Sequence, residues 1–156
     1  LGISKKAFDE TKGFSKMKTG EDIDLTFRLW NEDLETQLIE TAYVYHKRRS
    51  TIKQFFKQTF SFGIARPILN RKYPKTAKIT FWFPSLFIIG LDIAIIAIFF
   101  SFWQLLAFYG VYLTFIFLGS LFQNKNSKVA FLSIITTLTQ FYGYGLGFLQ
   151  SQFIKK

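Results

Sequence analysis

Residues 79–102 read ITFWFPSLFIIGLDIAIIAIFFSF, and this stretch decides the fold. Asp92 is its single charged residue, and the run is longer than the roughly 20 apolar residues that a helix needs to cross a bilayer. Residues 103–122 and 129–153 form two further apolar runs, of which the last is more mixed in composition. We therefore expect two to three transmembrane helices in residues 79–156.

The charges that flank these runs indicate their orientation. The connection around Ser101 is short and uncharged, which predicts a tight hairpin between the first two spans. Basic residues before residue 79 and the lysines of the polar loop 123–128 both belong on the cytoplasmic side by the positive-inside rule. Two spans satisfy this rule, whereas a third would carry Lys155 and Lys156 outside. We expect a multi-pass protein of the cell membrane with a cytoplasmic water-facing part, and a last run that either spans or is re-entrant.

Charge is distributed unevenly along the 156 residues, which carry 20 Lys and Arg against 10 Asp and Glu. Sixteen of the basic and nine of the acidic residues lie in residues 1–80, so the composition changes near residue 79. A basic surplus beside apolar spans predicts contact with anionic membrane lipids. Nucleic acid is the weaker reading, because no basic groove with interleaved aromatics is present outside the membrane-flanking part. The lack of Cys excludes disulfides and thiolate metal sites.

Residues 51–78 have the pattern of an amphipathic helix followed by a basic linker. Ser50 or Thr51 can cap the helix, and Lys53 and Lys57 lie one turn apart without an acidic partner. This pattern is typical of a helix that lies in the membrane interface, although a helix packed on its own soluble domain is the alternative. Pro67 is expected to end or kink it. The apolar side consists of Ile52, Phe55, Phe56 and Phe60.

Residues 1–50 read as a small water-facing region with two helices. Ser4 is a plausible N-cap for a helix over residues 5–10. A second helix begins at Gly20-Glu21-Asp22-Ile23-Asp24 and runs to about residue 32 or 33, with three carboxylates in its first turn. Acids at this position commonly stabilise a helix start, and Asp24 can pair with Arg28 one turn on. The alternative is that these carboxylates accept a proton or hold a metal ion.

Two short strands are predicted after this helix, at residues 36–40 and 43–46, from their aromatic and β-branched content. His46, the single histidine, ends the second strand. The three basic residues that follow it favour the neutral ring, which is the form that binds metal. A histidine packed at a strand end and bonded to backbone is the alternative.

Polar residues inside the apolar runs also suggest function. A carboxylate near the middle of a span is costly, so Asp92 should face a partner or water. It could line a lipid or substrate path, or it could be a protonated residue bonded to a neighbouring helix. Gly143 and Gly147 lie four residues apart among polar residues, which suggests a face for close helix packing.

Short motifs follow one another in a definite order through residues 1–70. They are Ile3-Ser4-Lys5-Lys6-Ala7-Phe8-Asp9, then Gly13-Phe14, then Gly20-Glu21-Asp22-Ile23-Asp24-Leu25 with Arg28, then the predicted strand that ends in His46, then Arg49 and an aromatic, basic helix to Gly63. This order and spacing resemble the second half of the catalytic domain of membrane-bound family 2 glycosyltransferases. The Gly-Glu-Asp, Arg and terminal His arrangement is similar also to the polypeptide N-acetylgalactosaminyltransferases.

The resemblance implies a fold and a catalytic residue. Residues 1–50 would be the C-terminal end of a GT-A-type α/β domain, mainly α with a short β hairpin, followed by the interfacial helix and two to three transmembrane helices. Asp22 would be the catalytic base that takes the proton from an acceptor hydroxyl, because a hydroxyl is a poor nucleophile until a base accepts its proton. Glu21 would orient Asp22 or bind the acceptor.

The resemblance also implies binding residues and a cofactor. Asp24, Arg28 and Arg49 would bind the acceptor or the diphosphate. His46 would match the histidine that helps to hold the metal in the N-acetylgalactosaminyltransferases. In the full-length enzyme a divalent cation, Mg²⁺ or Mn²⁺, would offset the charge of the leaving nucleotide diphosphate.

The sequence departs from the family pattern in three ways. Lys12 precedes Gly13 where the family usually has a second glycine. The Gln-x-x-Arg-Trp signature of processive synthases is absent after His46, which favours a single transfer. The nucleotide-binding half with its Asp-x-Asp motif is not in these residues, and the chain starts without Met. We therefore expect a fragment that does not bind nucleotide sugar productively alone.

Three functions are compatible with the sequence. The first is the C-terminal part of a membrane-bound glycosyltransferase that moves a sugar from a nucleotide-sugar donor to a lipid-linked or saccharide acceptor. The second is a non-catalytic membrane scaffold that holds partners through its basic helix and its helix-packing face. The third is a piece of a small transporter or channel that uses Asp92.

Overall fold

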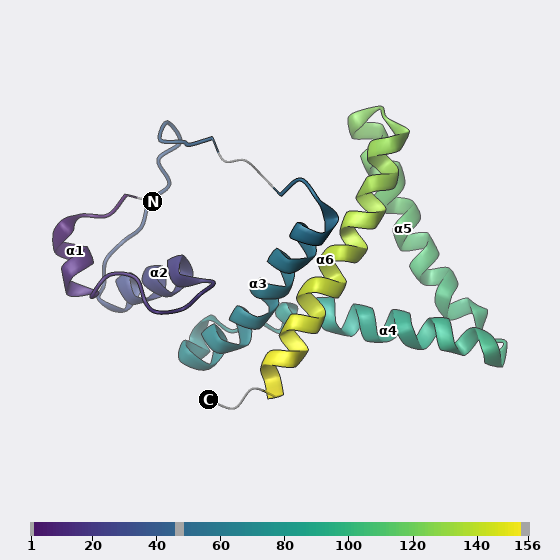
Figure 1. Cartoon of the computed structure of the whole chain (residues 1–156), viewed down its shortest axis with the longest axis horizontal. Coiled ribbons are helices and arrows are strands. Elements are labelled where there is room, and N and C mark those ends of the chain that lie inside the picture. The colour runs from purple at the N-terminus through teal and green to yellow at the C-terminus, as the bar shows by residue number, and fades with distance from the viewer. Residues whose placement is uncertain (1, 46–48, 154–156) are drawn as a thin grey trace.

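The structure, a computed structural model, describes residues 2–45 and 49–153, and these residues form six α-helices and three short 3₁₀ segments (Figure 1). The α-helices are α1 (Lys5–Glu10), α2 (Glu21–Asn31), α3 (Ile52–Lys72), α4 (Phe83–Ala97), α5 (Trp103–Asn124) and α6 (Ser127–Phe153). The 3₁₀ segments are η1 (Pro74–Thr76), η2 (Ile79–Trp82) and η3 (Ile98–Phe100).

The predicted β hairpin is wrong for the residues that the structure describes, because residues 34–45 form no strand. Leu38, Val44 and Tyr45 are 84, 88 and 95% exposed, so no second layer covers them. A strand needs a neighbour to pair with and a surface on which to bury one face, and a lone two-stranded hairpin is marginal in water. The expected end of a GT-A-type α/β domain is therefore corrected to an all-helical arrangement over the described ranges.

The first two helices begin where the local sequence signals place them. The hydroxyl of Ser4 accepts a hydrogen bond from the backbone N–H of Ala7, which caps α1. Gly20 caps α2 with a φ of 83°, a left-handed conformation that glycine adopts without strain. The buried face of α2 includes Leu25 and Leu29, and Asp24 on the same helix bonds to Lys72 at the end of α3.

Helix α3 begins at the predicted cap, Thr51, whose hydroxyl accepts from the N–H of Gln54. Pro67 does not end this helix, which continues to Lys72. Instead, α3 packs along α6, and the two lie side by side in the centre of Figure 1. A methyl group at Gly63 or Gly147 would collide with backbone atoms of the other helix. The close-packing face predicted in the last apolar run is thus confirmed, with α3 as its partner.

Helices α4 and α5 form the predicted hairpin at Ser101 and lie on the opposite side of α3 and α6 from α1 and α2 (Figure 1). The hydroxyl of Ser85 donates to the carbonyl of Gly145 (3.2 Å) and joins α4 to α6. The hydroxyl of Tyr109 donates to the carbonyl of Phe87 (3.2 Å) and joins α5 to α4.

Three helical segments, Ile79–Phe100, Trp103–Asn124 and Ser127–Phe153, are long and apolar enough to cross a membrane. They contain 22, 22 and 27 residues. At 1.5 Å per residue, even the shorter ones reach about 33 Å, slightly more than the hydrocarbon core of a bilayer. The structure is therefore compatible with a multi-pass membrane protein.

Candidate functional site

The first turn of α2 forms one wall of an open cleft. Asp22 is exposed and Glu21 is half-buried, and both line a cleft of about 850 Å³ between α2 and the first half of α3. One oxygen of Asp22, Oδ1, accepts from the backbone N–H of Ile23 (2.9 Å). The carboxylate thus stands at the N-terminus of α2, beside the exposed N–H groups of its first turn, and it remains accessible to a molecule in the cleft.

Three cations line the same cleft as these two carboxylates. Lys18 comes from the loop before α2, Arg49 from the segment before α3, and Lys57 from α3 itself. None of the three makes an ion pair with a carboxylate in the described ranges. The cleft therefore offers a proton acceptor together with positive charge that no carboxylate neutralises in the described ranges, which suits a molecule that carries both a hydroxyl and a phosphate.

Asp22 and Phe62 also line a second, smaller cavity of about 460 Å³. This cavity extends from the start of α2 toward α4 and α6, and Arg66 and Gln140 supply polar groups to it. Arg66 lies over the ring of Phe81, 4.3 Å from its centroid. Asp22 therefore stands between the polar cleft and the region where the chain enters the apolar helices.

Asp24, two residues further along α2, is fully buried and points away from the cleft into an ion-pair network. Its carboxylate lies 2.5 Å from Nζ of Lys72 and 3.1 Å from Nε of Arg28, and it accepts a hydrogen bond from Tyr73 (2.9 Å). Burial alone would raise the pKa of Asp24, but the hydrogen bonds from Lys72 and Tyr73 outweigh it, so that pKa is lowered. Asp24 therefore stays ionised and joins α2 to the end of α3.

Arg28 extends this network to the segment after α1. Its guanidinium donates to the carbonyl of Gly13 (2.6 Å) and to the carbonyl of Thr11, in addition to its contact with Asp24. The side chain holds the preceding loop on α2, with several of its donors used inside the protein. Acceptor or diphosphate binding by Asp24 and Arg28 remains a prediction, and neither residue lines the cleft that contains Asp22.

His46 and Asp92 are the two remaining predicted site residues. His46 lies outside the described residues. Asp92 lies on α4, within the apolar part of the chain, and accepts a hydrogen bond from the hydroxyl of Tyr142 on α6 (2.5 Å). This contact is of the kind that a structural carboxyl makes with a neighbouring helix, so it favours that alternative over a transport path.

No group of three or more His, Cys, Asp or Glu side chains in residues 2–45 and 49–153 could hold a metal ion. The two carboxylates of the cleft face cations rather than further acidic ligands. The described residues alone thus do not fit Mg²⁺ or Mn²⁺.

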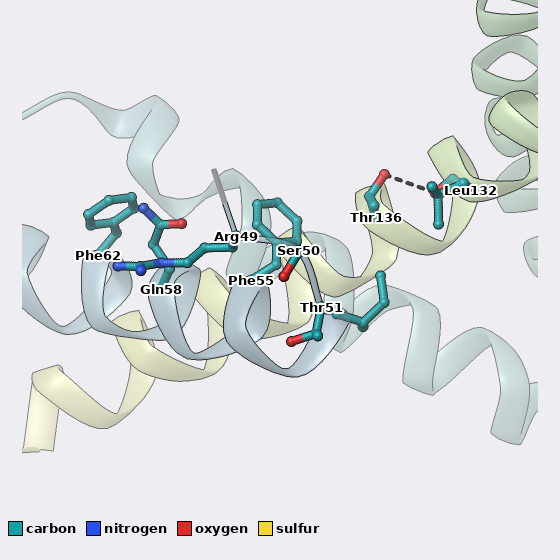
Figure 2. Close-up of a pocket in the computed structure, with 9 residues that line it drawn as sticks. Arg49, Ser50, Thr51, Phe55, Gln58, Phe62, Leu132 and Thr136 are labelled. Carbon is teal, nitrogen blue, oxygen red and sulfur yellow. Dashed lines mark hydrogen bonds between the residues drawn. The ribbon is translucent and has the colours of Figure 1, made fainter. Parts of the chain in front are cut away.

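Several cleft residues could not be identified from the sequence. Gln58 and Phe62 come from α3, and both also line a groove beside α6 that includes Arg49 (Figure 2). The sequence pattern shows these residues as part of an amphipathic helix, but it does not show which of them α6 leaves open.

No protein-family model, curated protein or solved structure matches the chain.

Proposed function

We propose that this chain is the C-terminal part of a membrane-bound family 2 glycosyltransferase that catalyses a single sugar transfer at the cytoplasmic surface of the membrane. The donor is a nucleotide sugar, and the acceptor is a lipid-linked or saccharide hydroxyl. The observation that carries the proposal is the exposed Asp22 carboxylate, which lines an open cleft with three cations beside helices that are long enough to span a bilayer.

In this proposal Asp22 acts as the general base. Its carboxylate takes the proton of the acceptor hydroxyl as that oxygen forms a bond to the anomeric carbon of the donor sugar. The bond between the anomeric carbon and the nucleoside diphosphate breaks, and the diphosphate leaves with the electron pair. Glu21 lies on the same cleft wall and positions the acceptor.

The cations of the cleft have a separate role. Lys57 and Lys18 line the same cleft as Asp22 and attract the negative charge of phosphate groups, which are present on the donor and on a lipid-linked acceptor. The groups that bind the nucleotide, and the residues that hold any divalent cation, are proposed to lie in a nucleotide-binding part outside these 156 residues.

The scaffold alternative receives less support from the same contacts. The glycine face that a partner could use is occupied by α3 in this chain, at Gly143 and Gly147. The transporter alternative depends on Asp92, whose carboxylate is bonded to Tyr142. Neither the scaffold nor the transporter function thus has an open site among these residues, whereas the cleft at Asp22 is open.

A transfer assay with the full-length protein tests the proposal. Membranes that contain the protein are incubated with a radiolabelled nucleotide sugar, and label is followed into lipid-extractable and saccharide products. We expect label to appear with the wild type and to be lost with Asp22→Asn at equal protein level. No transfer with a panel of common nucleotide sugars would remove the enzymatic proposal, and equal transfer by Asp22→Asn would remove Asp22 as the base.

A further inference from the structure

An apolar groove between α3 and α6 adjoins the candidate site. It has a volume of about 640 Å³, within the range of small-molecule pockets, and its walls are mostly apolar. Ile52, Phe55 and Phe62 line it from α3, and Leu132 and Thr136 line it from α6. In Figure 2, Arg49 extends along α3 toward Phe62, while Thr136 and Leu132 lie at the other end.

The groove and the polar cleft are adjacent, and together they mark a path along α3. Arg49, Gln58 and Phe62 line both of them, and Phe62 also lines the smaller cavity that includes Asp22. A single elongated molecule can therefore lie with one end between α3 and α6 and the other end beside Asp22. Along this path the environment changes from apolar to cationic to acidic.

The order of these environments indicates which kind of molecule fits the path. A free saccharide would lose hydration against Phe55 and Leu132, which offer it no hydrogen bonds, so it fits the mostly apolar groove less well than a hydrocarbon chain does. A hydrocarbon chain carries no polar groups that must be desolvated, so it packs on the same surface without this cost. Arg49, which makes no ion pair within residues 2–45 and 49–153, suits a phosphate at the point where the apolar wall ends.

We propose that the acceptor is a lipid that carries a phosphate or diphosphate, with its chain in the groove, its phosphate at Arg49 and its hydroxyl-bearing head beside Asp22. This inference rests on the proposed function for its last step, but lipid binding does not depend on sugar transfer. The shape and lining of the groove thus favour a lipid-linked acceptor over a free saccharide. In this arrangement Arg49 binds the acceptor rather than the donor.

Binding of a fluorescent polyprenyl phosphate to the full-length protein in detergent micelles tests the inference. Arg49→Gln should weaken binding at least tenfold. Lys53→Gln removes the same charge four residues further on, in the first turn of α3, at a residue that lines neither cavity, and it should change binding less than twofold. The uncharged polyprenol should bind at least tenfold more weakly than its phosphate. Equal binding by Arg49→Gln and wild type, or by alcohol and phosphate, would overturn the assignment.

A second pair of variants tests the groove itself. Leu132→Trp places a larger ring in the groove at a residue that is 50% exposed, so the fold should tolerate it. Phe131→Trp is its control, since Phe131 is 63% exposed and does not line the groove. We expect only Leu132→Trp to weaken binding, by at least fivefold. Displacement of the probe by equimolar phosphatidylglycerol would show a general anionic-lipid surface and would also overturn the inference.

The binding assay and the transfer assay can refute the lipid site and the enzymatic function separately. If the polyprenyl phosphate binds as described but no sugar is transferred, the lipid site stands and the proposed enzyme does not. If transfer requires Asp22 but proceeds equally well with Arg49→Gln and with Leu132→Trp, the enzyme stands and the acceptor assignment is wrong.

Discussion

Replacement of Asp24 by Asn should release α2 from α3, whereas replacement of Asp22 should not. The two carboxylates lie within one helical turn, yet Asp24 is 0% exposed and paired with Lys72 and Arg28, while Asp22 is exposed. The two Asp→Asn changes alter charge and size equally. Any difference between them therefore reports the buried network and not the acidity of the helix start.

The size of the effect follows from what each variant leaves behind. Removal of one member of a buried ion pair costs about 3–5 kcal/mol, because a charge stays buried without its partner. The Lys72 side chain is 46% exposed and can turn to water, so we expect the lower end, about 3 kcal/mol, for Asp24→Asn. Asp22→Asn should stay within about 0.5 kcal/mol, as is usual for surface changes.

Hydrogen exchange of the α2 amides in the full-length protein measures this difference locally, which avoids a two-state assumption for a membrane protein. A cost of about 3 kcal/mol corresponds to about 150-fold faster exchange in the Asp24→Asn variant. Exchange in the Asp22→Asn variant should remain within about threefold of the wild type. Similar exchange in the two variants would refute the reasoning that the Asp24 network joins α2 to α3.

Three further outcomes are expected. Gly147→Ala should destabilise the protein by about 1–3 kcal/mol in thermal unfolding because the methyl collides with α3, whereas Gly119→Ala, whose methyl meets open space, should not; equal effects would contradict the packing. Because the pKa of Asp24 is lowered from 3.8, α2 protection in hydrogen exchange should hold from pH 7 to 5 and fall only below pH 3.8; loss at pH 5 would contradict this. A double-mutant cycle of Asp92→Leu with Tyr142→Phe should give a coupling of about 1 kcal/mol, and a value near zero would mean that α4 and α6 are not joined there.

The helices were predictable because their signals are local. Ser4 and Thr51 each supply a side-chain oxygen to an N–H three residues on, and this capping needs no distant partner. The lack of strands could not be predicted in this way. Residues 36–45 have side chains suited to a strand, but in the described residues they have no neighbouring strand to pair with. Pro67 was expected to disturb α3, but packing against α6 over the length of the helix stabilises it beyond that point.

The candidate site was predictable only in part, because it depends on contacts between residues that are far apart in the sequence. The sequence places three acids in one turn and cannot rank them, since Lys72 and Tyr73 lie 48 and 49 residues from Asp24. Packing of α2 on α3 buries one carboxylate and leaves Asp22 in the cleft. The groove could not be inferred at all, because it depends on which parts of α3 the last helix covers.

The turnover of Asp22→Asn in the full-length protein tests the central claim most directly. The Asn side chain keeps the size of Asp22 but cannot take a proton, so kcat should fall about 100- to 10,000-fold while KM for the acceptor changes little. Polyprenyl phosphate binding and hydrogen exchange of α2 should match the wild type in the same preparation. A kcat within threefold of the wild type would contradict the claim that this carboxylate is the proton acceptor.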